Sequence, residues 1–235
     1  MPKKKITAYM SPGEQIAGTV FFVIYLLVLP FAAEPLFGAA GRLLGLSLSR
    51  SMKTAVCYYI LFAVTLLIFH GFLARTSRRL AENLGEALKS LAVGLVALYG
   101  LNELMYRLIG LFLSSRANLN DGTVSVRLDY APHMTLLIVL LLAPFVEEVL
   151  FRGLVFGNLK YKSRFLAYAA SCLLFALLHV WQFAVINQDF TYFLLMAQYL
   201  VPGLVLAWAY DHSGTLWASF GLHALANALS VWTMG

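Results

Sequence analysis

The chain has 235 residues, of which 61% are hydrophobic and only 12% are charged. Soluble domains are about 45–50% apolar and about 25% charged, so this composition excludes a soluble globular protein. It also excludes a disordered chain, which needs low hydrophobicity and high charge. The net charge of +6 comes from Lys and Arg residues that flank apolar stretches. Such residues anchor membrane spans, so the charge gives no support to a nucleic-acid partner.

The apolar residues fall into seven stretches of roughly 20 residues, the length that a helix needs to cross a bilayer. The predicted fold class is therefore an all-α, polytopic transmembrane helix bundle. We expect one integral membrane domain, with an N-terminal three-span region at 1–133 and a four-span core at 134–235. In chain order the predicted spans are 16–33, 54–74, 88–113, 134–157, 165–182, 190–210 and 216–234.

The positive charges predict an orientation for these spans. With the N-terminus inside, the inner segments carry ten Lys and Arg residues and the outer segments carry five. An excess of these residues marks the cytoplasmic side, so we expect an N-in/C-out topology with about seven spans. Short loops and the absence of an N-glycosylation sequence favour the bacterial cytoplasmic (inner) membrane.

Several interruptions of the helical pattern are predicted. Glu34-Pro35 indicates the end of the first span, because proline disfavours helix in the residue before it. The polar stretch 114–133 indicates an exposed outer loop. Pro144 is expected to kink the fourth span and to free backbone carbonyls near its polar residues, and Pro202 to loosen the sixth span similarly.

Ionisable side chains at membrane depth are costly, usually face the bundle interior and mark function. The densest group here is Glu147, Glu148 and Arg152. On a helix Glu148 and Arg152 stand at i, i+4 and can form an ion pair. Glu147 is rotated from Glu148 by about 100° and can stay free as a general base or acid. Alternatively, both carboxylates only hold helices together around Arg152. Glu103 and Arg107 repeat the i, i+4 spacing, as a neutralised pair facing other helices or as part of a substrate-access cavity.

Two histidines and an asparagine lie on later spans. His179 lies on the fifth predicted span, and His223 and Asn227 share one face of the seventh at i, i+4. At about 1.5 Å per residue, Glu147 lies roughly 15 Å from the inner side, His179 roughly 20 Å, and His223 with Asn227 roughly 12–18 Å. We therefore expect these four side chains in one layer at the middle of the membrane.

These residue types favour hydrolysis of an amide inside the membrane. A carboxylate and an imidazole can activate a water molecule for attack on a carbonyl group. A second imidazole and an amide can donate hydrogen bonds to the oxyanion that develops. Two histidines and one carboxylate can also form a catalytic zinc shell, and spacing alone does not separate the two alternatives.

Three short motifs follow one another along these spans. They are Glu147-Glu148-x-x-x-Arg152, Phe175-x-x-x-His179 and His223-x-x-x-Asn227. Each is weak alone, but the ordered set at membrane depth resembles the CPBP family. That family includes type II CAAX prenyl endopeptidases and bacteriocin-processing or self-immunity proteins, also called the ABI family. The resemblance covers about residues 134–234, and the first three predicted spans match only as apolar helices.

The resemblance implies an intramembrane glutamic endopeptidase, built as an all-α bundle around a water-filled cavity. By the family's pattern, Glu147 acts with His179 to activate the catalytic water. His223 and Asn227 form the oxyanion hole in the same pattern.

The resemblance further implies that Glu148 and Arg152 are supporting residues and that no metal is needed, although the residues themselves do not exclude zinc. The expected partners are the lipid bilayer and a substrate that enters from it, either a membrane protein or a lipidated peptide. Nothing in the sequence specifies a prenylated protein, and the sequence carries no signal of an oligomeric state.

Two other classes of protein stay open. A non-catalytic membrane scaffold or a bacteriocin-immunity protein could bind a partner through the same polar cavity, and it would tolerate Glu147→Gln. Transporters also use intramembrane Glu and His residues as proton relays. Against transport, the chain has no repeated halves.

Overall fold

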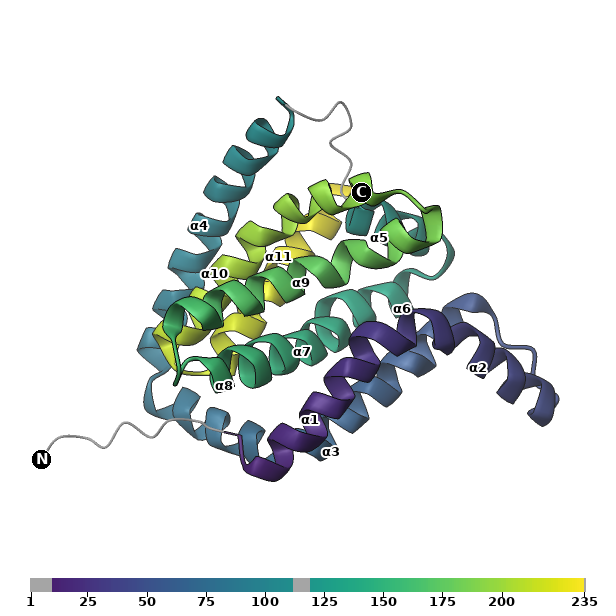
Figure 1. Cartoon of the computed structure of the whole chain (residues 1–235), viewed down its shortest axis with the longest axis horizontal. Helices are drawn as coiled ribbons and strands as arrows, with labels where there is room; N and C mark the ends of the chain where they lie inside the picture. Colours follow the sequence, from purple (N-terminus) through teal and green to yellow (C-terminus); the bar gives the residue numbers. More distant parts are fainter. Residues whose placement is uncertain (1–9, 112–118, 235) are drawn as a thin grey trace, which may run out of the picture.

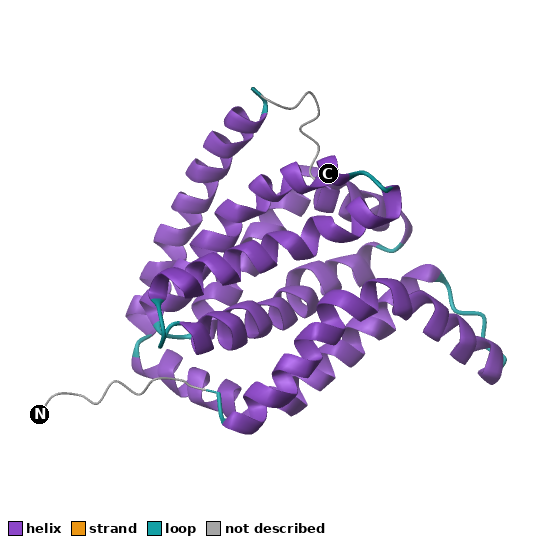
Figure 2. Ribbon diagram, in the orientation of Figure 1, coloured by secondary structure: helices purple, strands orange, loops and turns teal. Residues whose placement is uncertain are grey.

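The computed structural model describes residues 10–111 and 119–234, and the regular structure within them is helical throughout (Figures 1 and 2). The all-α prediction is therefore confirmed. The first elements are α1 (Pro12–Val23), η1 (Ile24–Val28), α2 (Leu29–Leu44), α3 (Arg50–Glu82), α4 (Leu84–Ile109) and α5 (Leu119–Tyr130). The later elements are α6 (Pro132–Leu137), η2 (Ile138–Leu142), α7 (Ala143–Glu148), η3 (Val149–Phe156), α8 (Gly157–Leu159), α9 (Arg164–Asn187), η4 (Phe190–Met196), α10 (Ala197–Ser213) and α11 (Leu216–Met234).

Six helical stretches in the described residues are long and apolar enough to cross a membrane, so the chain is an integral membrane protein. They are Pro12–Leu44, Arg50–Glu82, Leu84–Leu108, Pro132–Leu159, Arg164–Asn187 and Phe190–Ser213. The seventh predicted span is the 19-residue helix α11, which is not among the six and which carries the polar residues His223 and Asn227. Seven spans, the N-in/C-out orientation and the division at residues 133 and 134 stay predictions.

Two of the expected interruptions are wrong. The first span does not end at Glu34-Pro35: α2 continues through Pro35 and ends at Gly45, whose φ of 65° is left-handed. Proline is tolerated inside membrane helices because neighbouring groups satisfy the carbonyl it leaves free, and glycine ends the helix because it adopts positive φ without strain. The predicted loop 114–133 contains α5, which packs on α6 and α11, while residues 112–118 lie outside the described ranges.

The stretch from α6 to α8 runs through the middle of the molecule. Helices α9, α10 and α11 pack on one side of it and α1 and α3 on the other, while α4 leans along α10 (Figure 1). Within its most apolar window 67% of the residues are buried inside the protein, against 22–39% for the other five stretches. The two adjacent glutamates therefore lie on the most enclosed helix of the bundle.

A buried carboxylate joins α1 to α3. Ser11 and Glu14 form a capping box at the start of α1. Glu14 also accepts a hydrogen bond from the backbone N–H of Phe72 at 2.5 Å and pairs with Arg75 at 2.6 Å. The backbone N–H of Phe72 is available because α3 is kinked at Phe69, whose φ of −105° and ψ of 17° interrupt the helical ladder. The first helix is thus fixed to the kink of the third.

We expect Glu14→Ala to lower the free energy of unfolding by about 1–3 kcal/mol, because a buried N–H and a guanidinium lose their shared acceptor. Thermal unfolding in detergent measures this loss. The control is Glu34→Ala, which removes an exposed partner lying 3.9 Å from Lys53 and should cost less than about 1 kcal/mol. Equal losses in the two variants would contradict the role given to Glu14.

Candidate active site

The two adjacent glutamates close α7 and have different surroundings. Glu148 is fully buried, as is Arg152 one turn further along in η3, whereas Glu147 keeps 7% of its surface exposed. Arg152 Nη1 donates to Glu148 Oε1 at 3.0 Å, so the expected i, i+4 ion pair is present. Glu148 is therefore paired, and Glu147 remains at the edge of open space.

Arg152 also holds two other helices. Its Nη2 donates to the backbone carbonyl of Gly203 in α10 at 3.1 Å, and its guanidinium carbon lies 4.5 Å from the ring centroid of Phe175 in α9. Gly203 also lets α10 pack closely on α9, since a Cβ at that position would lie only 3.3 Å from the Cα of Cys172. One buried cation thus fixes α9 and α10 against η3.

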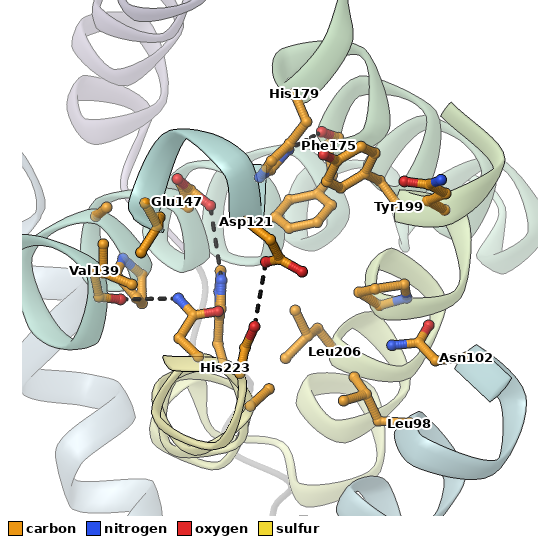
Figure 3. A pocket seen from close by; sticks show the side chains of 18 of the residues that line it. Leu98, Asn102, Asp121, Val139, Glu147, Phe175, His179, Tyr199, Leu206 and His223 are labelled. Carbon is orange, nitrogen blue, oxygen red and sulfur yellow. Dashed lines mark hydrogen bonds and ion pairs between the residues drawn. The ribbon is translucent and has the colours of Figure 1, made fainter. Parts of the chain in front are cut away.

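His223, on α11, lies between the two carboxylates. Its Nδ1 is 2.9 Å from Glu148 Oε1. Its Nε2 is 3.9 Å from Glu147 Oε2 (Figure 3). The hydroxyl of Ser219, one turn earlier on α11, donates to the other oxygen of Glu148. Because an ionised carboxylate only accepts hydrogen bonds, the Nδ1 of His223 carries a proton, and Nε2 is directed toward Glu147. Glu148 therefore orients His223.

His179 is held by its own helix and by an aromatic neighbour. Its Nδ1 is 2.9 Å from the carbonyl of Phe175 one turn earlier, and its ring stacks on Tyr199 with centroids 4.5 Å apart. The N–H on Nδ1 donates to that carbonyl, which leaves Nε2 for other contacts. Figure 3 shows His179, Glu147 and His223 around the same space. Within this group of three, Glu147 makes its ion-pair contact with His223.

Asn227 is anchored by a backbone carbonyl that a proline sets free. Its Nδ2 donates to the carbonyl of Val139 in η2 at 2.8 Å (Figure 3). The segment η2 is π-helical, and the N–H of Ala143 bonds the carbonyl of Ile138. The next donor in that pattern is Pro144, which has no N–H, so the Val139 carbonyl accepts a side chain. Nδ2 carries two N–H groups, and one of them remains for a ligand.

Two cavities meet at these residues. The first has a volume of about 390 Å³ and the second about 360 Å³, and Glu147 and His179 line both. Tyr58, Thr123 and Arg127 complete the shared wall. The first cavity is also lined by His223 and Asn227, so the structure brings all four predicted catalytic residues to one space, with Glu148 and Arg152 behind it. An elongated ligand can therefore extend from Glu147 into both cavities.

Sequence reasoning missed two side chains of this site. Ser219 stands four residues before His223, as Asn227 stands four after, so the i, i+4, i+8 spacing was a usable signal. Tyr25, in η1, interacts with Glu147 and lines the second cavity. It lies in an apolar stretch more than 100 residues away, and no local pattern connects the two residues.

Charged groups near the mouth of the first cavity come from α5 and α4. The hydroxyl of Ser230 donates to Asp121 at 3.2 Å, and burial raises the pKa of this carboxyl above its ordinary value against the lowering effect of that bond. Glu103 and Arg107 form their pair at 2.7 Å, but their side chains are 63% and 76% exposed. The expectation that this pair faces other helices is therefore wrong, and Glu103 lines the first cavity instead.

The described residues contain no group of three or more His, Cys, Asp or Glu side chains arranged to hold one metal ion. Each histidine of the site directs Nδ1 to a protein acceptor, Glu148 for His223 and the Phe175 carbonyl for His179. The expectation that hydrolysis needs no metal stays a prediction, to be tested with a chelator.

Ionisable and polar side chains gathered around an internal cavity of a membrane bundle mark a functional site. Residues 130–229 match the family described as type II CAAX prenyl endopeptidase Rce1-like, so this segment is similar to that family. The family is a protease family, and the matched segment contains all six residues singled out from the sequence. Among curated proteins and among solved structures, none matches the chain.

Two Glu–Arg pairs of the described residues share the i, i+4 spacing and provide a matched test of burial. We expect Arg152→Ala to lower the free energy of unfolding by about 3–5 kcal/mol, because it leaves the buried Glu148 charge uncompensated. Arg107→Ala breaks an exposed pair of the same spacing and should cost less than about 1 kcal/mol. Thermal unfolding of both variants in the same detergent compares them, and a small loss in Arg152→Ala would contradict the anchoring role.

Proposed function

We propose that this protein is an intramembrane endopeptidase that hydrolyses a peptide bond of a membrane-associated protein or a lipidated peptide. One observation carries the proposal: the segment that matches the protease family brings Glu147, His179, His223 and Asn227 to a single cavity inside the bundle. The composition and the loops of the chain favour the bacterial cytoplasmic membrane as its location.

In the proposed reaction Glu147 is the general base and His179 orients the water. One proton of the water passes to the Glu147 carboxylate as the water oxygen bonds to the carbonyl carbon. The tetrahedral intermediate then collapses, the C–N bond breaks, and the proton held by Glu147 passes to the leaving nitrogen. The products are a new carboxyl end and a new amino end. Glu147 suits this role because its neighbour Glu148, and not Glu147 itself, is paired with Arg152.

His223 and Asn227 stabilise the oxyanion in this proposal. The second N–H of Asn227 Nδ2 is one donor, since the first bonds the Val139 carbonyl. The Nε2 of His223 is the other, and donation from it requires protons on both ring nitrogens. Glu148 accepts the proton on Nδ1 and so holds the ring in place. Glu148 and Arg152 act as positioning residues.

We expect Glu147→Gln, His179→Ala and His223→Ala to abolish cleavage while the variants remain folded, because each removes a group that acts on the reacting atoms. A loss of about 10²–10⁴-fold is typical for a general base. Asn227→Ala removes one oxyanion donor and should reduce kcat by about 10²–10³-fold. The assay uses purified protein with a fluorescence-quenched, farnesylated peptide ending in Cys-aliphatic-aliphatic-residue, and the unmodified peptide alongside.

The matched control is Glu82→Gln, an exposed carboxylate at the end of α3 that lines neither cavity. It should leave cleavage unchanged. Newly formed protein termini in cells that carry wild type or Glu147→Gln at equal expression extend the test to natural substrates. Termini that are the same in both strains, together with an intact phenotype, would favour a scaffold or immunity role over a protease.

Treatment with a chelator distinguishes activation of the water by Glu147 from activation by a bound metal ion. If Glu147 activates the water directly, excess EDTA or phenanthroline should change the cleavage rate of the wild-type protein by less than about twofold. Loss of activity that added zinc restores would show instead that Glu147, His179 and His223 form a metal shell. A loss that added zinc does not restore would identify inhibition by the chelator itself.

A further inference from the structure

Gln198 is a buried amide without a hydrogen-bond partner. It lies in the first turn of α10, has 5% of its surface exposed and lines the first cavity. Within the described residues neither its Nε2 nor its Oε1 has a partner. Leaving such an amide unpaired inside a protein costs about 1–3 kcal/mol. A partner beyond the described residues would therefore offset the cost of burying this amide.

The backbone around Gln198 is also short of hydrogen bonds. The α-helical donor to the Gln198 carbonyl is the residue four positions later, which is Pro202 and has no N–H. Pro202 lines the same cavity. This arrangement repeats the one in η2, where Pro144 leaves the Val139 carbonyl free for Asn227. The side-chain amide of Gln198 lies one residue into α10 and has no partner among the described residues.

The position of Gln198 is fixed relative to the reacting groups. The next residue, Tyr199, stacks on His179, and Gly203 one turn further on is held by Arg152. Only the side-chain torsions of Gln198 remain free. Because its amide makes no hydrogen bond, turning it toward the cavity breaks none.

We propose that Gln198 binds a backbone peptide group of the substrate beside the scissile bond. Oε1 accepts the N–H of that group and Nε2 donates to its C=O. This inference rests on the proposed peptidase function and assigns to it a substrate-binding residue that does not contact the reacting carbonyl.

The chemistry of the cavity favours a peptide group over other ligands. An amide presents both a donor and an acceptor, which complements the paired N–H and C=O of an extended chain. A neutral amide gives no preference for an ion. Apolar side chains, among them Leu98 and Leu206, line the same cavity and suit the apolar side chains of a membrane substrate (Figure 3).

The stability of Gln198 variants distinguishes a substrate-binding role from a structural one. Gln198→Leu removes an unpaired buried amide at nearly constant volume, so its unfolding temperature should equal or exceed that of wild type. The control is Gln15→Leu. Gln15 lies outside both cavities and donates to the carbonyl of Met10 at 3.0 Å, so this variant should lose stability. A clear loss in Gln198→Leu and in the unbranched variant Gln198→Met would overturn the proposal.

Kinetics with ester analogues identifies the contact. The farnesylated quenched peptide is made with a single ester in place of one peptide bond, at each position flanking the cleaved bond, which removes one N–H at a time. For wild type, one analogue should raise KM about tenfold, the size of a single hydrogen bond. Gln198→Leu should raise KM for the parent peptide about tenfold, with kcat within twofold, and should lose sensitivity to that ester. Gln15→Leu should keep the wild-type pattern.

The outcomes separate this inference from the proposed function. If wild type cleaves the peptide and Glu147→Gln does not, but Gln198→Leu keeps the wild-type KM and the ester sensitivity, only the role of Gln198 is overturned. If wild type cleaves neither the farnesylated nor the unmodified peptide, the peptidase function and the role of Gln198 are both overturned.

Discussion

The buried ion pair of Arg152 and Glu148 is the interaction on which the rest of the site depends. Both charges are fully buried, so the hydrogen bonds that compensate them come from within the bundle. Glu148 bonds His223 and Ser219 from α11, and Arg152 bonds the Gly203 carbonyl of α10 through Nη2, while its Nε has no partner among the described residues. Helices α10 and α11 are thereby held around the end of α7. Glu147, one residue away, remains outside this network and open to the cavities.

Irregular helical backbone is the second feature on which the site depends. In a bilayer a free carbonyl is costly, and π-helical turns recur at functional sites. Three such segments occur among the described residues, and each presents a site group: Tyr25 in η1, the Val139 carbonyl in η2 and Arg152 in η3. Because Pro144 has no N–H, the Val139 carbonyl is free to accept the hydrogen bond of Asn227. Helix irregularity here supplies hydrogen-bonding groups at depths where water is scarce.

The sequence predicts what lies within one helix better than what lies between helices. The Glu148–Arg152 pair follows from i, i+4 spacing, and the shared face of His223 and Asn227 follows from the same periodicity. The bond of Asn227 to the Val139 carbonyl depends on how α11 meets η2, and no spacing encodes it. The polar composition of the stretch that contains α5 gave no sign of a helix. The predicted end of the first span came too early within α2, because proline interrupts helices less often in membranes. The catalytic roles themselves remain predictions that kinetics must decide.

Most residues that line the second cavity come from the N-terminal helices. Tyr25, in η1, and Tyr58, in α3, belong to the wall of the second cavity and lie outside the segment that matches the protease family, whereas His223 and Asn227 lie inside it. Among the described residues, the hydrogen bonds of Glu148 and Arg152 come from η3, α10 and α11 and not from the N-terminal helices, whereas Tyr25 interacts with Glu147. Substitutions in this wall that spare Tyr25 therefore remove none of these hydrogen bonds. Such a separation allows one chemical centre to serve differently shaped chains, with the choice of chain set by helices that do not hold the buried ion pair.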